Sequence, residues 1–184
     1  DSPLVNLVDP QTATVAPLGL VVNSQPSWST GQWSVENAEN GLNIAAGQKG
    51  VLRFDGEVDN LRVVREMTFS ADTYLISEKI RVVNTTDQAR SVRVSYTVAA
   101  DASNAAGGRY DAMRLAWDND GSLKEESSAS TLETTGVQAV GKIYWAGAMS
   151  TYFLTAVMPS EANNVTVKGV MQQLRDKGIR FALD

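Results

Sequence analysis

The acidic side chains that could carry acid–base chemistry are gathered in one short stretch of the chain. Asp118 and Asp120 flank Asn119 in an Asp-Asn-Asp-Gly run, and Glu125 and Glu126 follow it. A glycosidase needs two carboxyl groups that face each other across a cleft at a defined separation. Aspartate, asparagine and glycine in succession are instead typical of a turn, because they accept local backbone hydrogen bonds and tolerate positive φ. The run therefore predicts a hairpin turn.

The same run offers oxygen ligands for calcium, but its surroundings do not complete a calcium-binding loop. With Gly121 at the sixth loop position, Ala116 stands first and Ser127 twelfth, so the charged first ligand and the bidentate glutamate are both missing. The chain also contains no histidine and no cysteine. Ser-His-Asp and Cys-His arrangements and the usual zinc ligands therefore cannot be built. We expect no catalytic residue, no metal site and no cofactor.

Tryptophans have a second chemical use, because carbohydrate-binding sandwiches often stack sugars on exposed aromatic rings. Trp117 and Trp145 lie inside apolar segments, which predicts that their rings are buried in the core. Trp28 and Trp33 flank the polar segment Ser29–Gln32 and are the candidates for ligand contact. Core or lid packing remains the alternative for these two side chains.

Length and charge narrow the class of protein. A chain of 184 residues is most simply one domain, residues 1–184, with a substantial core. Its net charge of −5 and sequence pI of about 4.8 give no basic footprint for nucleic acid or anionic lipid. No nucleic-acid partner is therefore expected.

An uncharged run, residues 143–160, is long enough to raise the question of a membrane-spanning helix. Glycine, serine and threonine dilute its apolarity, and Pro159 closes it. Two strands fit this region better, Ala139–Ala146 and Thr151–Met158. Strands that are apolar on both faces are usually covered on both faces, so the run is predicted to be core.

Alternating apolar and polar residues predict antiparallel strands in the middle of the chain. The clearest are Asn60–Phe69, Thr73–Asn84 and Ser91–Ala99, with Ser70–Asp72 and Thr85–Arg90 as hairpin-length connections. Six further short strands are predicted between glycine- and asparagine-containing turns: Leu18–Asn23, Gln32–Glu36, Leu42–Ala45, Val51–Phe54, Met113–Trp117 and Val165–Met171.

This pattern indicates an all-β fold, an antiparallel β-sandwich with little helix. Asp101–Arg109 and Lys124–Thr135 are polar and are expected to form mobile loops. Lys79, Arg81 and Arg93 project outward from predicted neighbouring strands. Such a cluster is a candidate protein-interaction surface, because clustered charges steer weak encounters; an ordinary solvated face is the alternative.

Two segments carry a resemblance to a known family. Phe69, Asp72 and Tyr74, followed by an alternating apolar series that ends at Asn84, form the first. The second follows a pattern of W-x-G, then Y-F, then a nearby A and P, matched by Trp145, Gly147, Tyr152, Phe153, Ala156 and Pro159. Both resemble the periplasmic domain of the YidC family of bacterial membrane-protein insertases. An Asp-Lys pair that often precedes Tyr-Phe in the family is replaced here by Ser-Thr.

The resemblance implies an extended β-sandwich, a supersandwich of mutarotase-like and carbohydrate-binding-like shape, in the periplasm. The family's domain has further strands before Ser2–Val8 and beyond Phe181, so this chain is expected to be a fragment of a larger inner-membrane protein, truncated at both ends. The resemblance also implies a non-enzymatic accessory role in insertion and folding of inner-membrane proteins. Its expected partners are the Sec translocon with its accessory subunits and, through the full-length protein, nascent membrane proteins.

Mutarotase-like enzymes rely on histidine with a carboxylate, so a chain without histidine shares their shape and not their activity. Two other functions stay open. A carbohydrate- or lipid-moiety-binding sandwich needs a cleft lined by Trp28 or Trp33. A carboxylate-only hydrolase needs Asp118 or Asp120 for activity. Open strand edges also tend to pair with another chain, and we expect any such dimer of the fragment to be non-physiological.

Overall fold

The computed structural model describes residues 16, 18–36, 41–101, 114–149, 154–162, 165–173 and 177–183. Most of these residues lie in β-strands, and every strand pairing with a defined register is antiparallel. The all-β prediction is therefore confirmed. The chain forms two compact units, Val22–Arg93 and the combination of Asp1–Val21 with Val94–Asp184, and each is described by itself.

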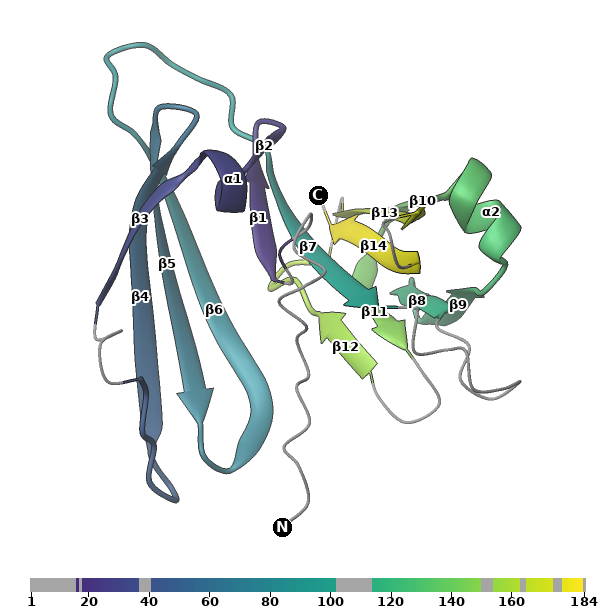
Figure 1. Ribbon diagram of the computed structural model, residues 1–184, viewed down its shortest axis with the longest axis horizontal. Helices are drawn as coiled ribbons and strands as arrows, with labels where there is room; N and C mark the ends of the chain where they lie inside the picture. Colours follow the sequence, from purple (N-terminus) through teal and green to yellow (C-terminus); the bar gives the residue numbers. More distant parts are fainter. Residues whose placement is uncertain are drawn as a thin grey trace. The chain divides into compact units, whose positions relative to one another are not determined.

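The unit Val22–Arg93 is built on a four-stranded sheet in the order β3-β4-β5-β6 (Figure 1). Its elements are β2 (Gln25–Pro26), α1 (Ser27–Thr30), β3 (Gln32–Glu36), β4 (Lys49–Val58), β5 (Leu61–Ser70) and β6 (Thr73–Asn84). β4 and β5 are joined by Asp59 and Asn60, with φ of 53° and 56°. Positive φ at both central residues matches the right-handed twist of the strands, which makes this a tight hairpin.

Side-chain alternation gives this sheet one apolar face and one charged face. The apolar face carries buried or half-buried residues from all four strands: Trp33, Leu52, Phe54, Val58, Leu61, Val63, Met67, Phe69, Ile80 and Val82. The charged face carries ionisable residues on the intervening positions: Glu36, Arg53, Asp55, Glu57, Arg62, Glu66, Lys79 and Arg81.

The second unit contains two sheets that pack on a common core. Within this unit one sheet has the strand order β10-β13-β14-β7-β1 and the other β12-β11-β8-β9. The elements are β1 (Gly19–Val22, whose last residue falls in the first unit), β7 (Val94–Asp101), β8 (Arg114–Asn119), β9 (Ser122–Glu126), α2 (Ala129–Thr134), β10 (Val137–Gly141), β11 (Ile143–Met149), β12 (Leu154–Val157), β13 (Val165–Gln173) and β14 (Lys177–Leu183).

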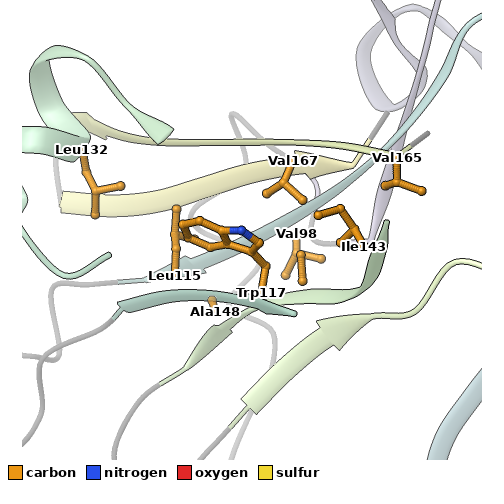
Figure 2. Packing of buried hydrophobic residues seen from close by; sticks show 9 residues of the cluster. Val98, Leu115, Trp117, Leu132, Ile143, Ala148, Val165 and Val167 are labelled. Atoms are coloured by element: carbon orange, nitrogen blue, oxygen red, sulfur yellow. The ribbon is translucent and has the colours of Figure 1, made fainter. Parts of the chain in front are cut away.

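Buried residues from both sheets and from α2 form the core of this unit, as Figure 2 shows. They are Val98, Leu115, Trp117, Leu132, Ile143, Ala146, Ala148, Val165 and Val167. Burial of apolar area is the main favourable term in folding, and here it joins two sheets face to face. The β-sandwich prediction and the burial of Trp117 are confirmed. The predicted burial of Trp145 in the core is wrong, because this residue is half-buried and is not part of the cluster.

Four predicted segments differ from the structure. The predicted strand Ala139–Ala146 is two strands, β10 and β11, which belong to different sheets. The change of sheet occurs where Gly141 adopts a φ of 145°, which favours glycine. The predicted loop Lys124–Thr135 is also wrong, because it contains the end of β9 and all of α2. The side chain of Ser128 accepts a hydrogen bond from Thr131 N and caps this helix.

The other two differences lie in the first unit. Thr85–Arg90 is not a hairpin connection, because β6 and β7 belong to different sheets. Leu42–Ala45 is not a strand; Leu42 and Ile44 instead lie over Gly50, where an added Cβ would come within about 3 Å of both side chains. Within the predicted segments Asp101–Arg109 and Thr151–Met158, residues 102–109 and 151–153 lie outside the described part of the chain.

In the described part of the chain, none of the helices has the length and apolar character needed to cross a bilayer. The uncharged run at residues 143–160 supplies β11 and β12 instead.

Candidate functional site

The Asp-Asn-Asp-Gly run forms the turn between β8 and β9, as predicted. Asp120 and Gly121 have φ of 53° and 78°. Gly121 N donates to Asp118 Oδ1 at 2.8 Å, so this carboxylate closes the turn. Such local bonds explain why aspartate and glycine are favoured here.

The neighbouring glutamates are also occupied by structural contacts. Glu125 pairs with Arg114 at 3.1 Å, and Glu126 Oε1 accepts from Ser128 N at 2.7 Å. Among the residues that the structure describes, no group of three or more His, Cys, Asp or Glu side chains could hold a metal ion. This region forms a hairpin turn and the segment that leads into α2, and the contacts of Asp118, Glu125 and Glu126 are local.

Trp33 is fixed against its own sheet. Its indole Nε1 donates to Ser27 O at 2.8 Å. A Cβ added to Gly56 would lie 2.6 Å from the Trp33 ring, so the ring covers the backbone of β4 at this glycine. Trp28, in α1, is half-buried. These contacts supply a packing role for Trp33, while ligand contact by either tryptophan stays a prediction.

Lys79 and Arg81 are exposed on β6, at the edge of the charged face. Lys79 stands opposite Glu66 and Arg81 opposite Val64 on β5. Arg93 is exposed too, but it precedes β7 and does not continue the row formed by Lys79 and Arg81. The structure therefore brings two of the three predicted cations together in one sheet.

The centre of the charged face is organised by a row of ion pairs. Arg62 donates through Nε to Asp55 Oδ1 at 2.9 Å and through Nη2 to Asp55 Oδ2 at 2.6 Å. Arg53 lies 3.8 Å from Asp55 and 3.9 Å from Glu36. The hydrogen bonds from Arg62 lower the pKa of Asp55 and raise that of Arg62 in turn, despite an opposing desolvation effect. This face therefore presents fixed charges of both signs.

A second polar cluster was not predicted from the sequence. The carboxylate of Asp59 accepts from Arg90 Nη2 at 2.9 Å and from Asn23 Nδ2 at 2.8 Å. Arg90 Nη1 also donates to Asp59 O at 2.9 Å, and Arg93 N donates to Asn23 Oδ1 at 2.9 Å. The cluster ties the β4–β5 turn to segments far away in the sequence. The only local signal was the Asp59-Asn60 pair between two alternating runs.

An ion pair on the apolar face was also missed. Arg65 Nε donates to Glu78 Oε1, and the two side chains are only 12% and 9% exposed. Glu78 Oε2 is buried without a hydrogen-bond partner among the described residues. In the alternating pattern of their strands, Arg65 and Glu78 stand at positions that otherwise carry apolar residues. The pairing register of β5 and β6 brings the two side chains together.

The glycine of the W-x-G pattern and the alanine that follows Tyr-Phe meet in the structure, whereas Tyr152 and Phe153 lie outside the described residues. Gly147 on β11 pairs directly with Ala156 on β12. A match to the model of the YidC periplasmic domain extends over residues 1–182. The chain belongs to the YidC periplasmic domain family.

Curated relatives named Membrane protein insertase YidC agree with this membership. One from Nitratidesulfovibrio vulgaris (strain DSM 19637 / Miyazaki F) is 51% identical over 94% of this chain and 31% of its own length. Others from Maridesulfovibrio salexigens and Lawsonia intracellularis are 41% and 40% identical over 94% and 93% of this chain, again with 31% of their own length covered. The chain thus spans about a third of these YidC relatives. No solved structure matches it.

Membership places the chain in the periplasm, as a domain of a membrane protein insertase. The family identified from the segment Met67–Asn84 and from the pattern between Trp145 and Pro159 is confirmed.

Proposed function

We propose that this YidC periplasmic domain acts by binding and not by catalysis, as an accessory module of the insertase. In this proposal residues 1–184 act as a single domain that assists insertion and folding of inner-membrane proteins. The Sec translocon and its accessory subunits are its partners, and nascent membrane proteins are reached through the full-length protein. The charged face of the sheet β3-β4-β5-β6 carries the interaction.

The observation that supports this proposal is the arrangement of charges on that face. The pairs between Asp55 and its two arginines hold the centre of the face in one arrangement, while Lys79 and Arg81 are exposed at its edge. Complementary charges of this kind raise association rates and set orientation more than they raise affinity. A transient accessory contact needs fast association and a defined orientation more than it needs high affinity. The carboxylates of Asp118, Glu125 and Glu126, by contrast, are engaged in local contacts.

Site-specific photo-crosslinking tests the proposed surface. A photoreactive amino acid is placed at Arg81 in the full-length insertase, with a matched probe at Val140, which is exposed in the other unit. Illumination of membranes is expected to yield a cross-link to a Sec subunit from position 81 and not from position 140. Equal yields from the two positions, or none from position 81, count against the charged face as the partner surface.

A further inference from the structure

The end of the sheet where β5 turns into β6 presents three consecutive exposed apolar residues. The register of the two strands shifts here, so that Phe69 alone stands opposite Tyr74, Leu75 and Ile76. A bulge of this kind interrupts the ladder and re-aims side chains. Tyr74 is 101% exposed, Leu75 53% and Ile76 40%.

Two more exposed apolar residues belong to the same end of the sheet. Val51 pairs with Thr68, next to the bulge, and Leu42 lies over Gly50, the partner of Phe69. Together with the three residues of β6 they form what we call the hairpin-end cluster, Leu42, Val51, Tyr74, Leu75 and Ile76. These are five of the thirteen large hydrophobic residues that are exposed in the described part of the chain. Clustering of this kind, unlike single exposed residues, marks an interaction site.

Hydrogen bonds hold the hairpin end in place. Gly47 N donates to Asp72 Oδ1 at 3.2 Å, and Ala71 N donates to Gln48 O at 3.2 Å. Leu75 N donates to Thr73 Oγ1 at 3.1 Å within the hairpin itself. The neighbouring turn therefore braces the hairpin, and the cluster is presented in a preorganised form. Preorganisation reduces the entropy lost on binding.

The chemistry of the cluster fits a lipid interface. A tyrosine ring is apolar with one polar hydroxyl, which suits the boundary between headgroups and acyl chains. Lys49 and Lys79 are exposed beside the cluster, whereas Asp72 accepts from a backbone amide and Glu78 is buried in its pair with Arg65. Glu66 stands opposite Lys79, so the positive and negative charges at this end balance, although the whole chain carries a net charge of −5.

The direction of the side chains separates a bilayer from a protein partner. Val51 lies on the charged face, whereas its neighbour Gly50 faces the other way and is covered by Leu42. The cluster therefore does not present one flat contact surface. A fluid lipid surface can enclose side chains that point in opposite directions. A protein partner meets mainly one face. The family's membrane attachment supplies a bilayer close to the domain.

We propose that the hairpin-end cluster inserts into the headgroup–acyl boundary of a phospholipid bilayer. It thereby anchors the β5–β6 end of the sheet to the membrane. The binding depends on apolar burial, so it does not require anionic lipid. The proposal rests on family membership and is independent of the Sec contact on the charged face.

The chain has no cysteine, so one introduced cysteine can carry an environment-sensitive fluorophore. Leu75→Cys is the probe, and Leu123→Cys and Val140→Cys are controls, since both controls are exposed apolar positions in the other unit. The labelled chain is tethered by an N-terminal polyhistidine tag to vesicles with nickel-chelating lipid. The remaining lipid in these vesicles is either phosphatidylcholine alone or an equal mixture of phosphatidylcholine and phosphatidylglycerol.

We expect a blue shift at position 75 in both vesicle types, with quenching by a spin label on the upper acyl chain, and neither effect at positions 123 and 140. Adding Tyr74→Ser and Ile76→Ser should lower the inserted fraction about tenfold. Adding Leu123→Ser and Val140→Ser to the same probe should leave it unchanged. Urea unfolding of each variant checks that the fold is kept.

Three results overturn the proposal. The first is a probe at position 75 that stays unshifted on both vesicles. The second is an equal shift at all three positions, which indicates non-specific adsorption. The third is a shift at position 75 that appears only with purified Sec proteins in detergent, which assigns the cluster to a protein partner.

Discussion

Gly147 of β11 and Ala156 of β12 face each other directly across the two strands. A Cβ atom added to Gly147 would lie 2.4 Å from Thr155 O and 2.9 Å from the Cα of Ala156. Both of these atoms belong to the backbone, which cannot move aside without disturbing the sheet. The glycine of the W-x-G pattern is therefore required by the close approach of two strands.

Gly147→Ala is expected to lower the free energy of unfolding by about 3 kcal/mol, because overpacking against backbone is costly. Gly121→Ala is the control: this glycine has open space around it and only a positive φ, 78°, so its replacement should cost about 1 kcal/mol. Urea unfolding followed by circular dichroism measures both. A Gly147→Ala cost no larger than that of Gly121→Ala contradicts the packing argument.

Strands with clear alternation could be predicted from the sequence, whereas the change of sheet could not. β5 and β6 were predicted almost to their ends because single residues alternate over their whole length. The division at Gly141 was not predicted, because apolar residues lie on both sides of the Gly141-Lys142 pair. The change of sheet depends on the backbone conformation of Gly141, which the residue pattern does not specify. The pair Arg65–Glu78 and the Asp59 cluster depend on strand register and distant segments, which local pattern does not specify.

The helix α2 was missed because its sequence is rich in serine and threonine, which have modest helix propensity. Its stability comes from tertiary packing, as Leu132 is 1% exposed in the core, and from the cap at Ser128. Ser128→Ala should lower the free energy of unfolding by about 1 kcal/mol. Ser127→Ala, an exposed neighbour, should have almost no effect. Equal effects of the two substitutions on chemical unfolding would show that the cap contributes nothing.

Asp59→Asn tests the cluster at the β4–β5 turn. Asparagine tolerates the positive φ of this position, so the turn itself is kept while the charge that faces Arg90 is removed. The free energy of unfolding is expected to fall by about 1–2 kcal/mol, since hydrogen bonds to charged groups are among the stronger ones. Asp87→Asn, at an exposed position in the same unit, is the matched control. Thermal or urea unfolding measures the free energy of unfolding of both variants. Equal values for the two variants would contradict a stabilising role of the cluster.

Asp55 makes the stability of the charged face depend on pH. Its pKa in the folded chain lies below the ordinary value of 3.8 because Arg62 hydrogen-bonds to its carboxylate. A lowered folded-state pKa contributes stability above pH 3.8, and this contribution is lost as the pH falls through the folded-state pKa. The difference in unfolding free energy between the unsubstituted chain and Asp55→Asn should therefore be present at neutral pH and vanish in strong acid.

A pH series of urea unfolding curves measures this difference. Added salt should reduce it at neutral pH, because the pair is exposed to solvent. If the difference in unfolding free energy between the unsubstituted chain and Asp55→Asn grows as the pH falls, the prediction is wrong.

The most direct test of the proposed function is charge reversal on the partner surface. Lys79→Glu in the full-length insertase is compared with Lys124→Glu, an exposed lysine in the other unit with the same change of charge. Co-purification of Sec subunits at low ionic strength is the measurement. The account predicts a several-fold loss for Lys79→Glu and none for Lys124→Glu. Unchanged Sec recovery with Lys79→Glu, or the same loss with both variants, would contradict it.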